Sequence, residues 1–335
     1  MKAVILAGGL GTRLRPLTLD TPKPIVPIFD RPFLYHQIEL IRQVPEIDEV
    51  ILSLNYQPDR IKARIGDGDE VGLTVRYMVE PKPLGTGGAI KFACTGIEET
   101  VLVFNGDVLT GIDLQAVVEK HFQRRATATI VLTTVSDPGT YGLVETDEQG
   151  NVRRFIEKPD QNEISCDTIN AGVYVLEPHT FDRIPEGVPW SIERQYFPTL
   201  TERSETFIAH VDPGYWLDIG TVDNYVLAHR DLMAQRCPGG PFSGLDTDAI
   251  YRSGQCLVED GAQLLGPGFL GSGTVIESGA RVGPRSVIGP GCRVTSGAIV
   301  EDSIIWRDTT ILAQAVVRDA VIGEGCIIED HVEIP

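Results

Sequence analysis

The stretch Lys2-Ala-Val-Ile-Leu-Ala-Gly-Gly-Leu-Gly-Thr-Arg13 opens the chain with a short apolar run that leads directly into a glycine-rich turn. The apolar run predicts a buried strand, and the glycines after it let an anion approach free backbone N–H groups closely. Two familiar phosphate loops do not match, because Gly11 is not followed by Lys and then Ser or Thr, and Leu14 occupies the place of a third glycine. The turn therefore predicts a phosphate-binding loop of another kind, with Arg13 and the more distant Lys23 as its positive charges.

The composition is that of an ordinary globular protein with room for two domains. The chain has 335 residues, 42% of them hydrophobic, and a formal net charge of -18. This charge argues against nucleic acid as a partner, since general binding to nucleic acid needs a concentrated positive face. Six cysteines are scattered singly without metal-ligand spacing, and we expect reduced core thiols. No apolar stretch is long enough to span a membrane and the first residues do not resemble a signal peptide, so we expect a cytoplasmic protein with no membrane partner.

Short apolar runs alternate with amphipathic segments over the first two thirds of the chain. This alternation predicts an α/β fold with a Rossmann-like, mostly parallel sheet and helical crossovers. We expect buried strands at residues 2–7, 49–54, 101–104, 129–133 and 172–176, and helices at residues 33–44, 114–125 and 222–235. The segment Cys237-Pro-Gly-Gly-Pro-Phe-Ser-Gly244 then interrupts every regular pattern and indicates a domain boundary.

A six-residue rhythm of large apolar residues follows this boundary. It passes through Val258, Leu264, Leu270, Ile276, Val282, Ile288, Val294 and Val300, continues through Trp306 and Leu312, skips, and resumes at Val316, Ile322, Ile328 and Ile334. A hexapeptide period is typical of a left-handed parallel β-helix, in which each buried aliphatic residue stacks on that of the previous coil. We therefore predict an α/β domain at residues 1–236, a linker at 237–250 and a β-helix at 251–335, and we expect the β-helix to support a homo-oligomer.

Two aspartates lie where a metal ion and phosphates could be held. Asp107 follows the predicted strand at residues 101–104, and the carboxyl ends of parallel strands form the ligand edge of such a sheet. Asp218 lies in an otherwise apolar stretch, where a solvated surface aspartate is not expected. Mg²⁺ is usually held by one or two carboxylates together with substrate phosphates. We therefore predict that Asp107 and Asp218 bind Mg²⁺, although a turn aspartate after Asn and Gly is also common.

Three further segments carry weaker indications. Lys158 could pair with a phosphate, and Glu157 and Asn170 could bind sugar hydroxyls, although Glu-Lys is among the commonest surface pairs. Residues 79–90 form a second glycine-rich turn, for which an ordinary helix start is as good an interpretation as a ligand loop. Glu80 in this turn could accept two hydrogen bonds from the N1–H and amino edge of guanine, which is a hypothesis about base choice alone.

These motifs, in this order, resemble those of the sugar-1-phosphate nucleotidyltransferases over residues 1–236. The matching segments are residues 8–18, 22–24, 84–89, 105–107, 157–159, 170–172 and 216–218. With the hexapeptide domain, Ser191-Ile-Glu-Arg194 and Phe197-Pro-Thr-Leu200 are most similar to the mannose-1-phosphate guanylyltransferases. Thymidylyl- or uridylyltransferases for glucose 1-phosphate, heptose-1-phosphate guanylyltransferases and a non-catalytic subunit that senses nucleotide-sugars remain as alternatives. A hexapeptide acyltransferase is disfavoured, because its β-helix needs a histidine base and His331 is the sole histidine after His229.

The resemblance implies a reaction between a nucleoside triphosphate and a sugar 1-phosphate with Mg²⁺ as the cofactor, and we expect these substrates to be GTP and mannose 1-phosphate. It implies that the nucleotide is bound by Leu6, Ala7, Gly8, Gly9, Gly11, Thr12, Glu80, Gly85 and Thr86. It implies catalytic roles for Arg13, Lys23 and Lys158 in neutralising phosphate charge, and metal binding by Asp107 and Asp218. It places Asn105, Gly142, Glu157 and Asn170 around the sugar phosphate.

Overall fold

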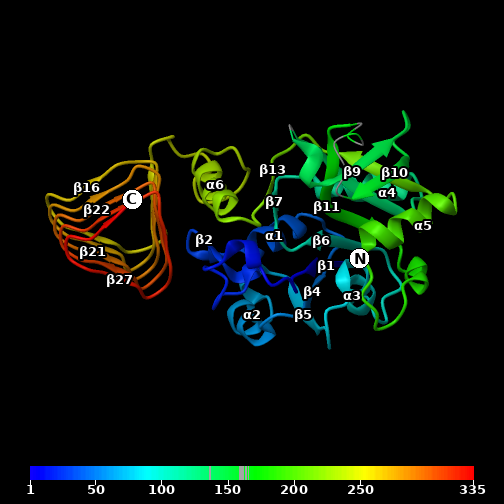
Figure 1. Cartoon of the computed structure of the whole chain (residues 1–335), viewed down its shortest axis with the longest axis horizontal. Coiled ribbons are helices and arrows are strands. Elements are labelled where there is room, and N and C mark those ends of the chain that lie inside the picture. Colours follow the sequence, from blue (N-terminus) through cyan, green and yellow to red (C-terminus); the bar gives the residue numbers. More distant parts are fainter. Residues whose placement is uncertain (136, 158–161, 163, 165) are drawn as a thin grey trace. The chain divides into compact units, whose positions relative to one another are not determined.

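The computed structural model describes residues 1–335 except 136, 158–161, 163 and 165, and it contains two compact units (Figure 1). The first unit comprises Met1–Thr12, Thr18–Ile25 and Leu34–Asp218, and the second comprises Arg13–Leu17, Val26–Phe33 and Ile219–Pro335. The predicted linker at residues 237–250 falls inside the second unit. The compact units therefore divide the chain at other places than the predicted domain boundary.

A nine-stranded mixed sheet forms the centre of the first unit (Figure 1). Its main path is β10-β9-β11-β6-β1-β4-β5, and β8 pairs with both β11 and β12. The strands are β1 Lys2–Leu6, β4 Glu49–Leu54, β5 Thr74–Val79, β6 Val101–Asn105, β8 Ala128–Thr134, β9 Gly142–Thr146, β10 Val152–Glu157, β11 Thr168–Leu176 and β12 Phe207–Val211. The predicted strands β6, β1 and β4 run parallel and β5, which was not among the expected strands, continues this arrangement, whereas β11 runs antiparallel to β6, β8 and β9.

Helices cover both faces of this sheet, and each face buries its own hydrophobic cluster. The helices are α1 Phe33–Ile41, α2 Pro58–Ile65, α3 Gly85–Ala93, α4 Leu114–Gln123 and α5 Phe197–Glu202. Successive residues of β1 alternate between the clusters: Val4 belongs with Ile90 of α3, and Ile5 belongs with Ile38 of α1. A parallel strand with helices on both faces must be apolar on both sides, which explains the continuous apolar run at the start of the chain.

Short elements complete the first unit. A two-stranded antiparallel sheet joins β7 (Val108–Thr110) to β13 (Trp216–Asp218), with Asp218 opposite Val108. The 3₁₀ turns are Thr12–Leu14, which crosses into the second unit, and then Lys23–Ile25, Asp69–Val71, Pro138–Thr140 and Pro178–Arg183, and one π-turn spans Ile192–Tyr196. No helix that the structure describes is long and apolar enough to cross a membrane.

Three parallel five-stranded sheets form the C-terminal part of the second unit, consistent with a left-handed β-helix whose stacked coils are visible in Figure 1. The first sheet contains β14 Ile250–Arg252, β17 Gly268–Leu270, β20 Ser286–Ile288, β23 Ile304–Ile305 and β26 Val321–Ile322. The second contains β15 Leu257–Val258, β18 Val275–Ile276, β21 Arg293–Val294, β24 Thr310–Ile311 and β27 Ile327–Ile328. The third contains β16 Gln263–Leu264, β19 Arg281–Val282, β22 Ile299–Glu301, β25 Val316–Arg318 and β28 Glu333–Ile334.

The predicted hexapeptide register is right up to Val300 and wrong for the next three positions. The residues that enter the β-helix core are Ile305, Ile311 and Val317, in place of Trp306, Leu312 and Val316. The cause is a step of five residues instead of six, once between Val300 and Ile305 and again between Val317 and Ile322. The predicted single skip after Leu312 is therefore replaced by two shortened corners, each just before a strand of the first sheet.

An aromatic cluster joins the rest of the second unit to the β-helix. The hairpin of β2 (Pro27–Ile28) and β3 (Arg31–Pro32) places Phe29 against His229 of α6 (Val222–Met233), with ring centroids 5.1 Å apart, and against Phe269 of β17, at 4.9 Å. The indole N–H of Trp306 donates a hydrogen bond to the hydroxyl of Tyr225 (3.0 Å). Trp306 thus points away from the β-helix core and packs beside α6, so Ile305 takes the core position that was predicted for Trp306.

The cysteines are all free thiols, as predicted. Cys94, Cys237 and Cys292 are buried, whereas Cys166, Cys256 and Cys326 are partly exposed, so the prediction of core thiols holds for half of them. Burial raises the pKa of the Cys94 thiol to about 12, which keeps this group protonated at neutral pH.

Candidate active site

The first glycine-rich turn is packed against three strands at its start, and its backbone becomes accessible further along. The N–H of Ala7 donates to the carbonyl of Ser53 (2.9 Å), and the N–H of Gly106 donates to the carbonyl of Leu6 (3.0 Å). A Cβ on Gly8 would lie 3.1 Å from the backbone N of Asn55, whereas a Cβ on Gly9 would meet nothing within 4 Å. The turn is therefore fixed to β1, β4 and β6 at its start, and its backbone is accessible from Gly9 onward.

Gly11 links this turn to Lys23. Its φ is +61°, in the left-handed region that favours glycine, and the Thr18 hydroxyl donates a hydrogen bond to its carbonyl (2.7 Å). A Cβ on Gly11 would lie 3.2 Å from the Cβ of Lys23. The proline-rich stretch between them thus returns the chain to the glycine turn, so the distant lysine lies beside the loop that the sequence pairs with it.

Lys23 lies between the two aspartates that the sequence predicts as metal ligands. Its ammonium Nζ is 2.9 Å from Oδ2 of Asp107 and 3.9 Å from Oδ1 of Asp218. The Lys23 side chain is 10% exposed, that of Asp218 18% and that of Asp107 33%, so the group is mostly shielded while Asp107 is still reachable from solvent. With two carboxylates around one ammonium, this group carries a net negative charge.

The fold explains why these residues meet. Asp107 occupies the turn from β6 to β7, at the carboxyl end of a central parallel strand. Asp218 ends β13, which pairs with β7 so that Asp218 lies opposite Val108, the neighbour of Asp107. Lys23 begins the 3₁₀ turn Lys23–Ile25. Three segments far apart in the sequence therefore converge at the carboxyl end of β6, the edge where ligands bind in many parallel sheets.

The donor set suits Mg²⁺ in chemical terms. Asp107 and Asp218 offer carboxylate oxygens to a single position that a cation, the ammonium of Lys23, already contacts. Among the described residues no group of three or more His, Cys, Asp or Glu could hold a metal ion. Two carboxylates would therefore need substrate phosphates to complete the coordination, which is the common arrangement for Mg²⁺.

The predicted sugar-phosphate residues Asn105 and Asn170 lie on neighbouring strands. Asn170 is engaged within the protein: its Nδ2 donates to the hydroxyl of Tyr174, and its Oδ1 accepts from the N–H of Gly172 (2.9 Å each). Gly172, with φ of +75°, packs against the side chain of Asn105. A Cβ on Gly172 would lie only 2.8 Å from Asn105 Nδ2. Sequence reasoning did not show that Gly172 packs directly on Asn105, and sugar binding by Asn105 and Asn170 stays a prediction.

The remaining sugar-site predictions concern β9 and β10. Gly142 is buried in β9, where it pairs with Glu157 at the end of β10. Lys158 and the side chain of Glu157 lie outside the described part of the chain. Trp216, which sequence analysis placed in a motif without a role, donates its indole N–H to the carbonyl of Ala171 (2.9 Å).

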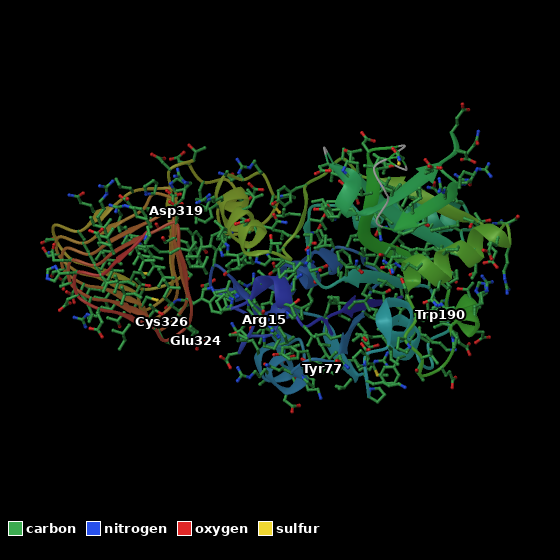
Figure 2. All side chains as sticks on the ribbon, in the orientation of Figure 1. Arg15, Tyr77, Trp190, Asp319, Glu324 and Cys326 are labelled. Atoms are coloured by element: carbon green, nitrogen blue, oxygen red, sulfur yellow. The ribbon has the colours of Figure 1, made fainter. Side chains whose placement is uncertain are left out.

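The second glycine-rich turn is held from within the protein. The N–H groups of Gly87 and Gly88 donate to the carbonyl of Trp190 (2.8 and 3.2 Å), which lies beside α3 in Figure 2. A Cβ on Gly85 would come within 2.8 Å of that same carbonyl. The Thr86 hydroxyl donates to Glu193 (2.8 Å) and accepts from a backbone N–H. The helix-start interpretation accounts for these contacts, and nucleotide binding by Gly85 and Thr86 stays a prediction.

Glu80, near the start of the second glycine-rich turn, is 8% exposed and lies beside Gly8 of the first. Its carboxylate accepts hydrogen bonds from the N–H of Leu84 (2.9 Å) and from the hydroxyl of Ser53 (3.3 Å), and one oxygen lies 3.3 Å from where a Cβ on Gly8 would be. Burial raises the pKa of Glu80 above its usual value, and these two hydrogen bonds oppose that rise. Each carboxylate oxygen keeps a further lone pair for a ligand.

Arg13 belongs to the second compact unit, within the 3₁₀ turn Thr12–Leu14, whereas Lys23 and both aspartates belong to the first. Two catalytic cations of the sequence prediction therefore belong to different units, although ten residues separate them in the chain.

The chain is similar over its whole length to proteins of known activity. A family model described as "Nucleotidyl transferase" matches residues 2–235, and one described as "GMPPB C-terminal domain" matches residues 264–335. A mannose-1-phosphate guanylyltransferase of Mycobacterium tuberculosis is 41% identical over 89% of this chain and 82% of its own length. Mannose-1-phosphate guanylyltransferase 1 of Arabidopsis thaliana is 35% identical over 100% of this chain and 97% of its own length.

Two further similarities widen the comparison. A UTP–glucose-1-phosphate uridylyltransferase of Synechocystis is 32% identical over 98% of this chain and 88% of its own length. The crystal structure of HddC from Yersinia pseudotuberculosis covers 69% of this chain and 99% of HddC, with 34% identity and a TM-score of 0.60, and its complex with GMP-PN gives a TM-score of 0.59. These matches cover both the α/β part and the hexapeptide part of the sequence, and the chain belongs to the nucleotidyl transferase family.

Proposed function

We propose that this enzyme transfers the guanylyl group of GTP to mannose 1-phosphate, forming GDP-mannose and pyrophosphate. The observation that carries the proposal is the convergence of Lys23, Asp107 and Asp218 beside the first glycine-rich turn. The choice of base and sugar is supported by the named activity of the relatives, two of which match at 35% and 41% identity.

The chemistry needs little beyond positioning. A phosphate oxygen of the sugar 1-phosphate attacks the α-phosphorus, a new P–O bond forms, and the bond to pyrophosphate breaks with its electrons leaving on the pyrophosphate oxygen. The attacking oxygen is already an anion near neutral pH, so no general base is required. The barrier is the repulsion between two anions, which positioned cations and backbone N–H groups reduce.

The chain offers these groups. The open backbone from Gly9 onward would contact the triphosphate, and Lys23, Arg13 and Lys158 would neutralise phosphate charge. Mg²⁺ bound by Asp107 and Asp218 would supply a further positive charge to the phosphates. Lys23 would hold the two carboxylates in place, since its ammonium contacts both. Asn105, Gly142, Glu157 and Asn170 would line the sugar site, and the β-helix would support self-association.

The direct test is a pyrophosphate-release assay with Mg²⁺ over a grid of substrates. GTP, UTP and dTTP are each combined with mannose, glucose and heptose 1-phosphates. GTP with mannose 1-phosphate should give the highest kcat/KM. The second candidate is the uridylyltransferase reaction, favoured by the Synechocystis relative, and a preference for UTP with glucose 1-phosphate would replace the proposal with it.

The metal assignment has its own prediction. Asp107→Asn should abolish turnover and leave the fold intact, because it removes a charged ligand from a partly exposed side chain. The change is checked by the same assay together with circular dichroism. Asp48→Asn, at a side chain that is 72% exposed, is the matched control and should keep full activity. An active Asp107→Asn enzyme would contradict the assignment.

A further inference from the structure

Gln37 is a buried amide in the middle of α1, on the side of the helix that packs against the sheet. It is 2% exposed, and its helix neighbours Leu34, Ile38 and Ile41 belong to the hydrophobic cluster on that face. A polar side chain in such a stripe needs hydrogen-bond partners to offset its desolvation. The hydrogen-bond partners of Gln37 therefore show which part of the protein this buried amide holds.

Both amide hydrogens of Gln37 are used on one turn. Its Nε2 donates to the carbonyl of Asn105 (2.8 Å) and to the carbonyl of Val108 (2.9 Å). These two carbonyls bracket Gly106 and Asp107, so the amide spans the turn that carries the proposed metal ligand. In the same turn, the N–H of Gly106 donates to the carbonyl of Leu6 (3.0 Å), next to the first glycine-rich turn.

The hydrogen bonds of Gln37 differ from those of a core residue that only stabilises the fold. Among the described residues Oε1 of Gln37 has no hydrogen-bond partner, although the atom is buried. A buried polar atom without a partner costs stability and calls for an explanation. The two donors supply one, because together they fix the direction in which the turn presents Asp107.

We propose that Gln37 is a positioning residue for Asp107: by holding the carbonyls on both sides of the turn, it sets the carboxylate for the divalent cation. This inference rests on the proposed function, in which Asp107 is a Mg²⁺ ligand. Groups that orient a metal ligand without touching the metal typically change metal affinity or activity by about 10–100-fold when they are removed.

The test uses Gln37→Met in the full chain, since methionine has a similar length and no donors. Mn²⁺ is the probe, titrated with GTP and without sugar phosphate, and its binding to the protein is followed by water-proton relaxation. The variant should bind Mn²⁺ about 10–100-fold more weakly and need correspondingly more Mg²⁺ for half-maximal turnover. Thr100→Val is the control: Thr100 is 8% exposed, immediately precedes β6 at the end opposite Asp107, and loses one hydrogen bond, to Glu177 (2.6 Å).

The results of these titrations distinguish a failure of the positioning role of Gln37 from a failure of the proposed metal site. If Gln37→Met folds and keeps wild-type affinity for Mn²⁺ and Mg²⁺, the positioning role is wrong. If the wild type binds no Mn²⁺, or if Asp107→Asn leaves the Mn²⁺ signal unchanged, the metal site of the proposed function fails instead. Gln37→Glu keeps the side-chain shape and loses both donors when ionised, so it should show the same loss at pH 8. If neither variant folds, Gln37 is a folding residue and the proposal is overturned.

Discussion

At the scale of single residues, the site concentrates charge where water is scarce. Lys23 is 10% exposed yet charged, and its contacts with Asp107 and Asp218 provide the compensation that a shielded ammonium needs. Removal of the Lys23 charge would leave two neighbouring carboxylates without their shared cation, whereas removal of either aspartate charge would leave one neutral ion pair and one carboxylate ligand fewer. This explains why a substitution there should affect catalysis more than its small change in volume suggests.

Glu80 has the opposite relation to its surroundings: burial raises its pKa, and the groups that oppose this rise are the neutral N–H of Leu84 and the hydroxyl of Ser53. A raised pKa in the folded state means that ionisation costs folding free energy as the pH rises. We therefore predict that Glu80→Gln raises the melting temperature at pH 8. The gain should disappear below about pH 4, where the carboxyl is protonated in both the folded and the unfolded chain.

Thermal unfolding from pH 4 to 8 measures this difference. The exposed Glu119→Gln on α4 is the control and should show no such trend. If Glu80 also reads the base, the same variant should lose preference for GTP over UTP in the substrate grid. A variant with an unchanged melting temperature at pH 8 would contradict the cost assigned to the buried carboxylate.

At the scale of elements, the turn from β6 to β7 has no spare room. A Cβ on Gly106 would lie 2.3 Å from the carbonyl oxygen of Leu6. Gly106→Ala should therefore destabilise the protein by about 1–3 kcal/mol through overpacking and displace Asp107. Unfolding in urea and the pyrophosphate-release assay would show losses of both stability and turnover. Gly323→Ala, where a Cβ would meet nothing within 4 Å, should change neither.

The link between α6 and its neighbours depends on one hydroxyl. Tyr225 donates to the carbonyl of Pro27 (2.6 Å) and accepts from the indole of Trp306 (3.0 Å), entirely inside the second unit. Tyr225→Phe leaves both partners unpaired and should cost about 1–3 kcal/mol in urea unfolding. Tyr251→Phe is the control, since its described contacts are ring contacts with Phe242 and Phe269. Equal losses in the two variants would refute the role of the hydroxyl.

At the scale of the whole molecule, the C-terminal residues complete a unit that begins near the N-terminus. A chain ending at Arg236 would keep Phe29 and Tyr225 but lose Phe269 and Trp306, which cover them. Exposing a large aromatic side chain costs about 1.5–3 kcal/mol. We therefore predict that this truncated chain melts at a lower temperature than the full chain and aggregates in size-exclusion chromatography. A monodisperse truncated chain with the full melting temperature would disprove this.

Much of the fold is predictable because local pattern and tertiary burial agree. The strand Glu49–Leu54 forms over the predicted residues, since an apolar run between helical segments has one good place in an α/β sheet. The β-helix is predictable from its period, but the run Ile304-Ile305-Trp306 offers three apolar candidates for one core position. The choice among them depends on α6, which lies more than seventy residues earlier in the chain and accommodates the tryptophan.

The proximity of Lys23, Asp107 and Asp218 was predictable where charge type and strand ends coincide, and their roles stay predictions. Gln37 could not be found in this way, because a glutamine in an amphipathic helix carries no signal until its partners are known. Trp190 holds the second glycine-rich turn through hydrogen bonds of its backbone N–H and carbonyl, and a backbone hydrogen bond leaves no trace in residue type.

The assignment of Arg13–Leu17 and Val26–Phe33 to the second unit has an evolutionary consequence. The chain passes from one unit to the other five times, and four of these crossings occur before residue 35. A single recombination event between the catalytic and hexapeptide regions would therefore import a β-helix without the N-terminal segments that group with it. We therefore expect stable chimaeras between relatives to require both segments to be exchanged together with the C-terminal coils.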